Sequence, residues 1–167
     1  MTAGFFSTLV PALAILVPFA GTLLILISRR PAARWLCVAA SAISLLFCLL
    51  SMKSCWMNGM EGVTTPLLHL GSVTVFGFTV DRVSSLLATA FVGIGMLVTV
   101  YSTAYLDESN KEHPDKHRKR FYAVFCAFIG AMAGVVFSST ILGQLVFFEI
   151  TGACSWALIG YYNTPAS

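Results

Sequence analysis

The sequence has 167 residues, of which 57% are hydrophobic and only 10% are charged, and its mean hydropathy is +0.85. Soluble domains carry about 25% charged residues, so this composition excludes a water-soluble globular protein and indicates a membrane protein. The net charge of +3 reflects where the loop bases lie and does not imply nucleic-acid binding.

Apolar runs long enough to cross a bilayer occur five times along the chain. A hydrocarbon core about 30 Å thick needs roughly 20 apolar residues per helix. The sequence therefore predicts an all-α integral membrane protein with five transmembrane helices, over residues 5–27, 35–52, 83–101, 121–138 and 141–162.

The first run is predicted to be a retained helix, because its basic residues follow the apolar stretch instead of preceding it as in a signal peptide. Pro11 and Pro18 lie inside it. Membrane helices tolerate proline where neighbouring groups satisfy the freed carbonyls, so we expect a kink and no break.

The segment 53–80 between the second and third runs is rich in glycine, and its second part is β-branched and aromatic. The stretch 72–80 is too short to span a membrane and is typical of a strand. We expect a short β-hairpin-like segment at the membrane surface, followed by Asp81 as the N-cap of the third helix.

The basic residues are distributed unequally between the two sides of the membrane. Lys53 and Arg82 fall on one side, and eight bases fall on the other. These eight are Arg29, Arg30, Arg34, Lys111, Lys116, Arg118, Lys119 and Arg120. Basic loops stay in the cytoplasm, so we expect a multi-pass protein of the bacterial inner membrane with a periplasmic N-terminus and hairpin and a cytoplasmic C-terminus.

Metal and redox motifs are not favoured by the sequence. The five cysteines form no CxxC pair and predict neither a disulfide framework nor an iron–sulfur cluster. His113 and His117 have helical spacing for two metal ligands, but Pro114 separates them and a third ligand is missing nearby. We predict no metal, cofactor-binding or catalytic residue on this chain.

The last two runs are joined only by Ser138–Thr140, which predicts an antiparallel helical hairpin. In the fourth run, small residues recur every four positions, as in Gly130 and Gly134. This spacing lets helix backbones approach closely, so we expect this face to pack against another helix.

Glu149 lies in the middle of the fifth apolar run. A carboxylate at that depth costs on the order of 3 kcal/mol, so it should face the bundle interior or a water-filled path. Two roles remain open: a structural carboxyl that bonds a neighbouring helix, or a group that transfers protons or pairs with a buried base. Gln144 is a candidate to line the same path, and Trp156 is expected to be packing.

Three stretches resemble one known family. They are residues 81–87 (DRVSSLL), 98–106 (VTVYSTAYL) and 121–162, the last containing GQLVFFEITGACSW. Together they resemble the antiporter-like membrane subunits of respiratory complex I, multisubunit cation/proton antiporters and membrane-bound hydrogenases, and within that family the hydrogenase-4 branch.

The resemblance implies that Glu149 matches the family's essential carboxylate, which pairs with a lysine on a later, broken helix to move protons. It implies a role in proton translocation coupled to electron transfer in partner subunits, with nickel-iron and iron–sulfur centres in those partners. The alternatives are a subunit of a multisubunit Na+/H+ antiporter, or a structural membrane subunit. Residues 1–167 are expected to form one membrane domain, the N-terminal part of a longer subunit that is fragmentary, truncated or split.

Overall fold

The computed structural model describes residues 2–57, 62–70, 73–106 and 118–160. In chain order its elements are α1 (Thr2–Ile27), α2 (Arg30–Met57), β1 (Val63–Leu70), β2 (Val73–Val80), α3 (Arg82–Tyr105), α4 (Arg118–Phe137) and α5 (Ile141–Ile159). All five helices are long and apolar enough to cross a membrane, which confirms the prediction of five transmembrane helices. Helices α2 and α3 extend beyond the apolar runs at both ends, and α4 begins three residues earlier and ends one residue earlier than its run.

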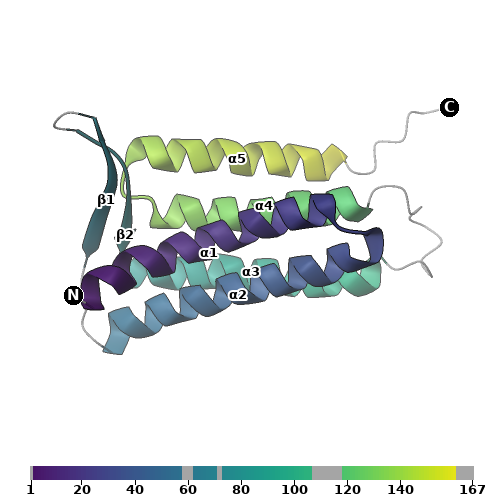
Figure 1. The fold of residues 1–167 in the computed structure, drawn as a ribbon, viewed down its shortest axis with the longest axis horizontal. Coiled ribbons are helices and arrows are strands. Elements are labelled where there is room, and N and C mark those ends of the chain that lie inside the picture. Colours follow the sequence, from purple (N-terminus) through teal and green to yellow (C-terminus); the bar gives the residue numbers. More distant parts are fainter. Residues whose placement is uncertain (1, 58–61, 71–72, 107–117, 161–167) are drawn as a thin grey trace.

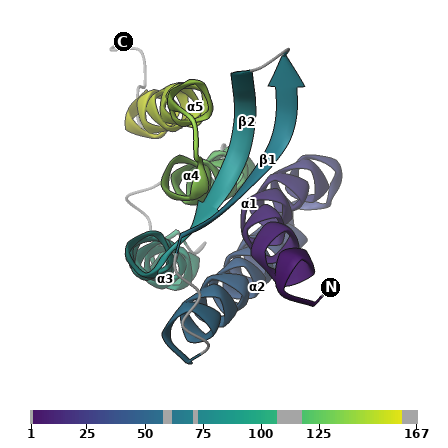
Figure 2. The same ribbon diagram turned by 90° about the vertical axis from the view of Figure 1, so that its left-hand side faces the viewer.

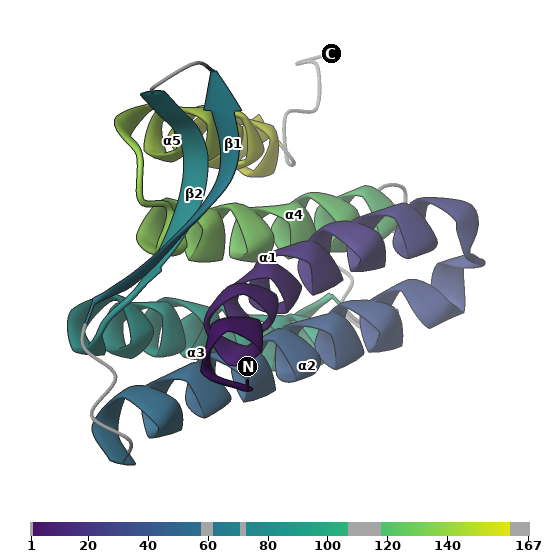
Figure 3. The same cartoon turned by 60° about the vertical axis from the view of Figure 1, so that its left-hand side comes forward.

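The helices lie side by side in one bundle, with the β-hairpin across one end (Figures 1 and 3). Helix α4 is central and packs against α1, α2, α3 and α5. Helix α5 packs mainly against α4 and β2, and the end-on view in Figure 2 places it at the edge of the bundle. The helix that carries Glu149 is therefore the one with the fewest neighbours.

The small residues of α4 pack against two different helices, as predicted. Gly130 lies against the backbone of Ile15 and the ring of Pro18 in α1. Gly134 lies against the ring of Phe147 in α5, where an added methyl group would overlap that ring. Close approach at these glycines sets the distance of α4 from both neighbours.

Proline in α1 is accommodated by a hydrogen bond from the next helix. Helix α1 continues through Pro11 and Pro18. Pro18 has no N–H to donate to the carbonyl of Ala14, and the hydroxyl of Ser44 in α2 donates to that carbonyl at 2.6 Å. Both Ser44 and Ala14 are fully buried, so the α1–α2 contact supplies a bond that the proline removes.

The predicted hairpin is present, with β1 and β2 antiparallel. It is joined to the turn between α4 and α5. The N–H of Ser139 donates to the carbonyl of Gly77 at 2.9 Å, and the hydroxyl of Thr140 donates to the carbonyl of Val75 at 2.9 Å. The hairpin thus fixes the point at which α5 begins.

Asp81 caps α3, as expected from the sequence. The N–H of Ser84 donates to Oδ1 of Asp81 at 2.5 Å, and the N–H of Asp81 donates to the Ser84 hydroxyl at 3.0 Å. This reciprocal pair is a capping box. The hydrogen bonds from Ser84 lower the pKa of the Asp81 carboxyl from its ordinary value.

Candidate functional site

Glu149 is positioned by the start of α5. Thr140 is the N-cap, and its hydroxyl accepts a hydrogen bond from the N–H of Gly143 at 3.2 Å. Glu149 follows Ile141 by eight residues, which is about 12 Å along the helix axis. In a hydrocarbon core of about 30 Å, its carboxylate lies near the middle of the membrane.

The two sides of α5 have different surroundings. Gly143 and Phe147 are buried against α4, and Ile150 and Leu158 are partly buried on the same side. Glu149 is exposed on the other side. We call that exposed side the Glu149 face. It comprises Glu149 with Leu142, Leu145, Val146, Gly152, Ala153 and Trp156, all exposed.

We expected Glu149 to face the interior of a helix bundle or a water-filled path. In the described part of the chain it does not lie in the bundle interior. Phe147, two positions earlier, points to α4 instead because the Gly134 backbone leaves room for its ring. The five described helices therefore leave the carboxylate on their outer surface.

A mid-membrane carboxylate on an open surface is costly. Helix α5 contains no lysine or arginine, and among residues 2–57, 62–70, 73–106 and 118–160 none forms an ion pair with Glu149. Exposure of a carboxylate to lipid at this depth costs on the order of 3 kcal/mol. A charged Glu149 is therefore unfavourable where this face meets lipid directly.

Gln144 and Trp156 differ from their predicted roles. The Gln144 side chain turns back and donates from Nε2 to the carbonyl of Ser138 at 3.4 Å, which ties it to the α4–α5 turn and away from Glu149. Trp156 is 76% exposed, so the expectation that it packs is not met within this bundle. Its spacing of seven residues from Glu149, two helical turns, is the sequence signal that places both on one side.

Several polar side chains in the bundle interior join helices. The thiol of Cys126 donates to the carbonyl of Pro18 at 3.2 Å, and the hydroxyl of Thr22 donates to the carbonyl of Ala123 at 3.2 Å. Sequence reasoning treated the cysteines only as small apolar residues and missed these bonds. In the described ranges there is no group of three His, Cys, Asp or Glu side chains that could hold a metal ion. His113 and His117 lie outside the described residues.

The fold and this site define a polytopic membrane protein with a carboxylate in the middle of one span. Comparison with known proteins places it more closely. The family described as NADH-ubiquinone oxidoreductase (complex I), chain 5 N-terminus, matches residues 68–122. The chain belongs to the family of antiporter-like membrane subunits and matches the N-terminal portion of that family.

The relatives include subunits of cation/proton antiporters and chains of NAD(P)H-quinone oxidoreductases. The chain is 33% identical over 161 residues to a probable K(+)/H(+) antiporter subunit of Rhizobium meliloti, covering 91% of this chain and 15% of that protein. It is 33% identical over 165 residues to a Na(+)/H(+) antiporter subunit of Alkalihalophilus pseudofirmus, and this alignment covers 97% of this chain and 19% of that protein. It is 34% identical over 86 residues to NAD(P)H-quinone oxidoreductase chain 5 of Picosynechococcus, and this alignment covers 52% of this chain and 12% of that protein. The chain thus spans less than a fifth of each relative.

Proposed function

We propose that this chain is part of a proton-translocating membrane subunit, in which Glu149 binds and releases the transported proton. One observation carries the proposal: the carboxylate lies in mid-membrane on a side of α5 that the described helices do not cover. A structural carboxyl would be expected to bond a neighbouring helix of its own bundle. Ionisable groups at this depth mark ion pathways.

The Glu149 face is suited to contact with another helix. Gly152 and Ala153 lie next to Glu149 on this face, and an atom added at Gly152 would meet nothing within 4 Å. Small residues of this kind allow close approach of a second helix. We propose that a helix from a further part of the protein or from a partner subunit covers the face and places a basic side chain opposite Glu149.

We further propose that the parent complex is of the hydrogenase-4 type, formate-hydrogenlyase-like and related to complex I. In that assignment, electron transfer occurs in peripheral partner subunits that hold nickel-iron and iron–sulfur centres. This chain supplies only part of the proton path. The resemblance of residues 121–162 to that branch supports the assignment.

A second candidate is a subunit of a multisubunit cation/proton antiporter with no redox partners. The extent of the alignments supports it, since two antiporter subunits align over 91% and 97% of the chain. Purification of the tagged protein and transport assays on native membranes distinguish the two candidate functions. Hydrogen-dependent proton uptake by inverted vesicles supports the first candidate, and sodium- or potassium-dependent proton release without an electron donor supports the second.

The carboxylate proposal is tested by Glu149→Gln in the complete complex, with Glu149→Asp as the matched control. Gln keeps the size and polarity of the side chain but cannot exchange a proton at the carboxyl, so we expect proton transport in inverted vesicles to be lost while the complex still assembles. Asp should retain part of the transport. Undiminished pumping by the Gln variant, measured with a pH-sensitive dye, would show that Glu149 is not on the path.

A further inference from the structure

Two thiols from distant parts of the chain meet in the interior of the bundle. Cys37 belongs to α2 and Cys126 to α4, and both side chains are fully buried. They interact with each other where these two helices pack together. The proposed proton site lies on α5 and uses neither thiol, so the pair has no role in the function argued above.

Each of the helices α1, α2, α3 and α4 contributes a polar side chain to the layer that contains this pair. The thiol of Cys126 donates to the carbonyl of Pro18 in α1 at 3.2 Å, and the Thr22 side chain of α1 also interacts with Cys126. The hydroxyl of Thr99 in α3 interacts with the Cys37 thiol. Both sulfurs are therefore held by polar neighbours on other helices.

Close packing of three helices fixes the positions of the two thiols. A Cβ atom added at Gly21 of α1 would lie 2.7 Å from Cβ of Ala40 in α2 and 3.1 Å from the sulfur of Cys126 in α4. Ala40 follows Cys37 by three residues, so both lie on one side of α2. Because the backbones already stand this close, little further ordering is needed to bring both sulfurs onto one ion.

Two adjacent thiols in a dry site favour a soft cation that takes two ligands. Soft metal ions prefer sulfur, and the thiolate that binds them forms when the thiol proton leaves. With mercuric chloride, two S–Hg bonds form and two Hg–Cl bonds break, while two protons and two chloride ions leave to the solution. A divalent ion on two thiolates leaves the site neutral, which matters because an unpaired buried charge is costly.

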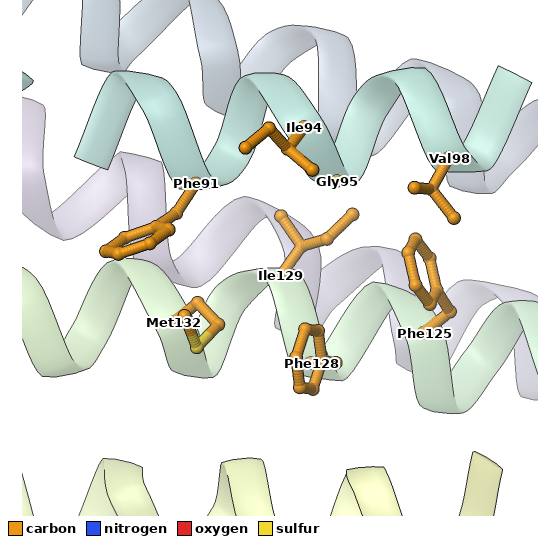
Figure 4. A pocket seen from close by; sticks show the side chains of 8 residues that line it. All are labelled: Phe91, Ile94, Gly95, Val98, Phe125, Phe128, Ile129 and Met132. Atoms are coloured by element: carbon orange, nitrogen blue, oxygen red, sulfur yellow. The ribbon is translucent and has the colours of Figure 1, made fainter. Parts of the chain in front are cut away.

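An apolar groove on the outer surface of the bundle adjoins this layer. It lies between α3 and α4, has a volume of about 180 Å³ and includes Val98 and Phe125 in its lining, and Figure 4 shows its side chains between the two helices. Gly95 also lines the groove, and its carbonyl accepts a hydrogen bond from the Thr99 hydroxyl at 2.9 Å. A neutral metal halide can therefore come close to the two thiols from the apolar side of the membrane.

From this geometry we infer that Cys37 and Cys126 form a binding site for a soft divalent cation with two-thiolate coordination, such as Hg²⁺. The bound ion ties α2 to the central helix α4 inside the membrane. The spacing of cysteines along the sequence does not show this site, because its two ligands come from helices that meet only in the folded bundle.

The probe is mercuric chloride, added to the complete protein with any partner subunits in detergent micelles. A small monothiol then removes mercury held by one sulfur only, and the protein is digested without reduction for mass spectrometry. We expect one mercury-linked pair of peptides, containing Cys37 and Cys126. Cys48 and Cys55 are equally buried but lie about 10 Å apart along α2, so they should be free of mercury. Mercury retained at these controls instead, or at no cysteine of this chain, would overturn the inference.

Cys126→Ser and Cys48→Ser form a matched pair of variants, since each replaces a fully buried thiol by a hydroxyl. The second sulfur of a pair acts at an effective concentration of about 1 mM or more. At about 0.1 mM monothiol, Cys126→Ser should therefore retain about tenfold less mercury at Cys37 than wild type does. Cys48→Ser should retain as much as wild type, and equal retention at Cys37 in the two variants would contradict the inference.

The peptide link in the wild-type protein decides the question even if a variant fails to elute from gel filtration as wild type does. Zn²⁺ tests the number of ligands, because it takes four and the described ranges hold no group of three His, Cys, Asp or Glu side chains. We expect the same monothiol to remove Zn²⁺ completely while Hg²⁺ stays bound. Zn²⁺ retained as strongly as Hg²⁺ would show that further ligands complete the site, and two-thiolate coordination would be wrong.

Discussion

At the scale of single residues, a hydrogen bond can be predicted from the sequence when its two partners are close together in the chain. Asp81 was recognisable as a cap because its only required partner, Ser84, is three residues away. The accommodation of Pro18 was expected in general, but Ser44, which donates to the Ala14 carbonyl, is 30 residues distant. Such a partner follows from helix packing, which sequence spacing does not encode.

The capping box gives a pH-dependent prediction. The folded-state pKa of Asp81 is lowered, so its ionised form contributes stability above the ordinary carboxyl pKa of about 3.9. This contribution is lost as the pH falls through the lower folded-state value. At neutral pH, Asp81→Ala should lower the free energy of unfolding by about 1 kcal/mol.

The measurement is unfolding in mixed micelles followed by circular dichroism, with Asp81→Asn as the control. Asn still caps a helix but does not titrate. We therefore expect Asp81→Asn to be nearly as stable as wild type, and the gap between wild type and Asp81→Ala to shrink in acid. A gap that is constant with pH would mean that the charge of Asp81 contributes nothing.

At the scale of helices, α5 is attached to the bundle through a narrow contact. The Phe147 ring packs on Gly134 and lies 5.9 Å from the ring of Phe76 in β2. Sequence spacing correctly predicted that α4 has a small-residue face, but it did not show that this face serves α1 at Gly130 and α5 at Gly134. Two helices share one row of glycines because successive turns of α4 meet different neighbours.

Gly134→Ala and Gly152→Ala form a matched pair on neighbouring helices. An added methyl at Gly134 overlaps the Phe147 ring, whereas at Gly152 it meets nothing within 4 Å. Overpacking of this kind costs about 1–3 kcal/mol. Gly134→Ala should therefore destabilise the purified chain, measured by denaturant titration, and Gly152→Ala should not.

A larger substitution at Gly152 tests whether the Glu149 face is covered in the assembled protein. If another helix packs there, a larger substitution, Gly152→Leu, should reduce co-purification of the covering segment or subunit while the isolated chain stays folded. Normal assembly of Gly152→Leu would show that the face is open to lipid or water.

At the scale of the whole molecule, the bundle gathers the basic residues of distant loops at one end. The contact between Thr22 and Ala123 joins the last part of α1 to the first part of α4. Arg29 and Arg118 consequently lie toward the same end, as the charge pattern predicted. The hairpin is at the opposite end (Figure 1).

Which end faces the cytoplasm stays a prediction, and labelling in intact cells tests it. In a background without the native cysteines, Thr64→Cys in β1 should react with a membrane-impermeant maleimide added outside. Arg120→Cys should react only after the membrane is permeabilised. The reverse pattern would invert the proposed orientation, because the basic end would then lie outside.

The sequence by itself determined the class of protein, the number of spans, the hairpin, the Asp81 cap and the depth of Glu149. These depend on composition and on contacts within a few residues, where helix geometry and the bilayer thickness are constant. The tertiary structure decided which side of α5 meets α4, and so left Glu149 on the open face and Phe147 in the core. This arrangement depends on side chains that pack across helices, such as the Phe147 ring on Gly134, and the spacing of residues in the sequence does not specify it.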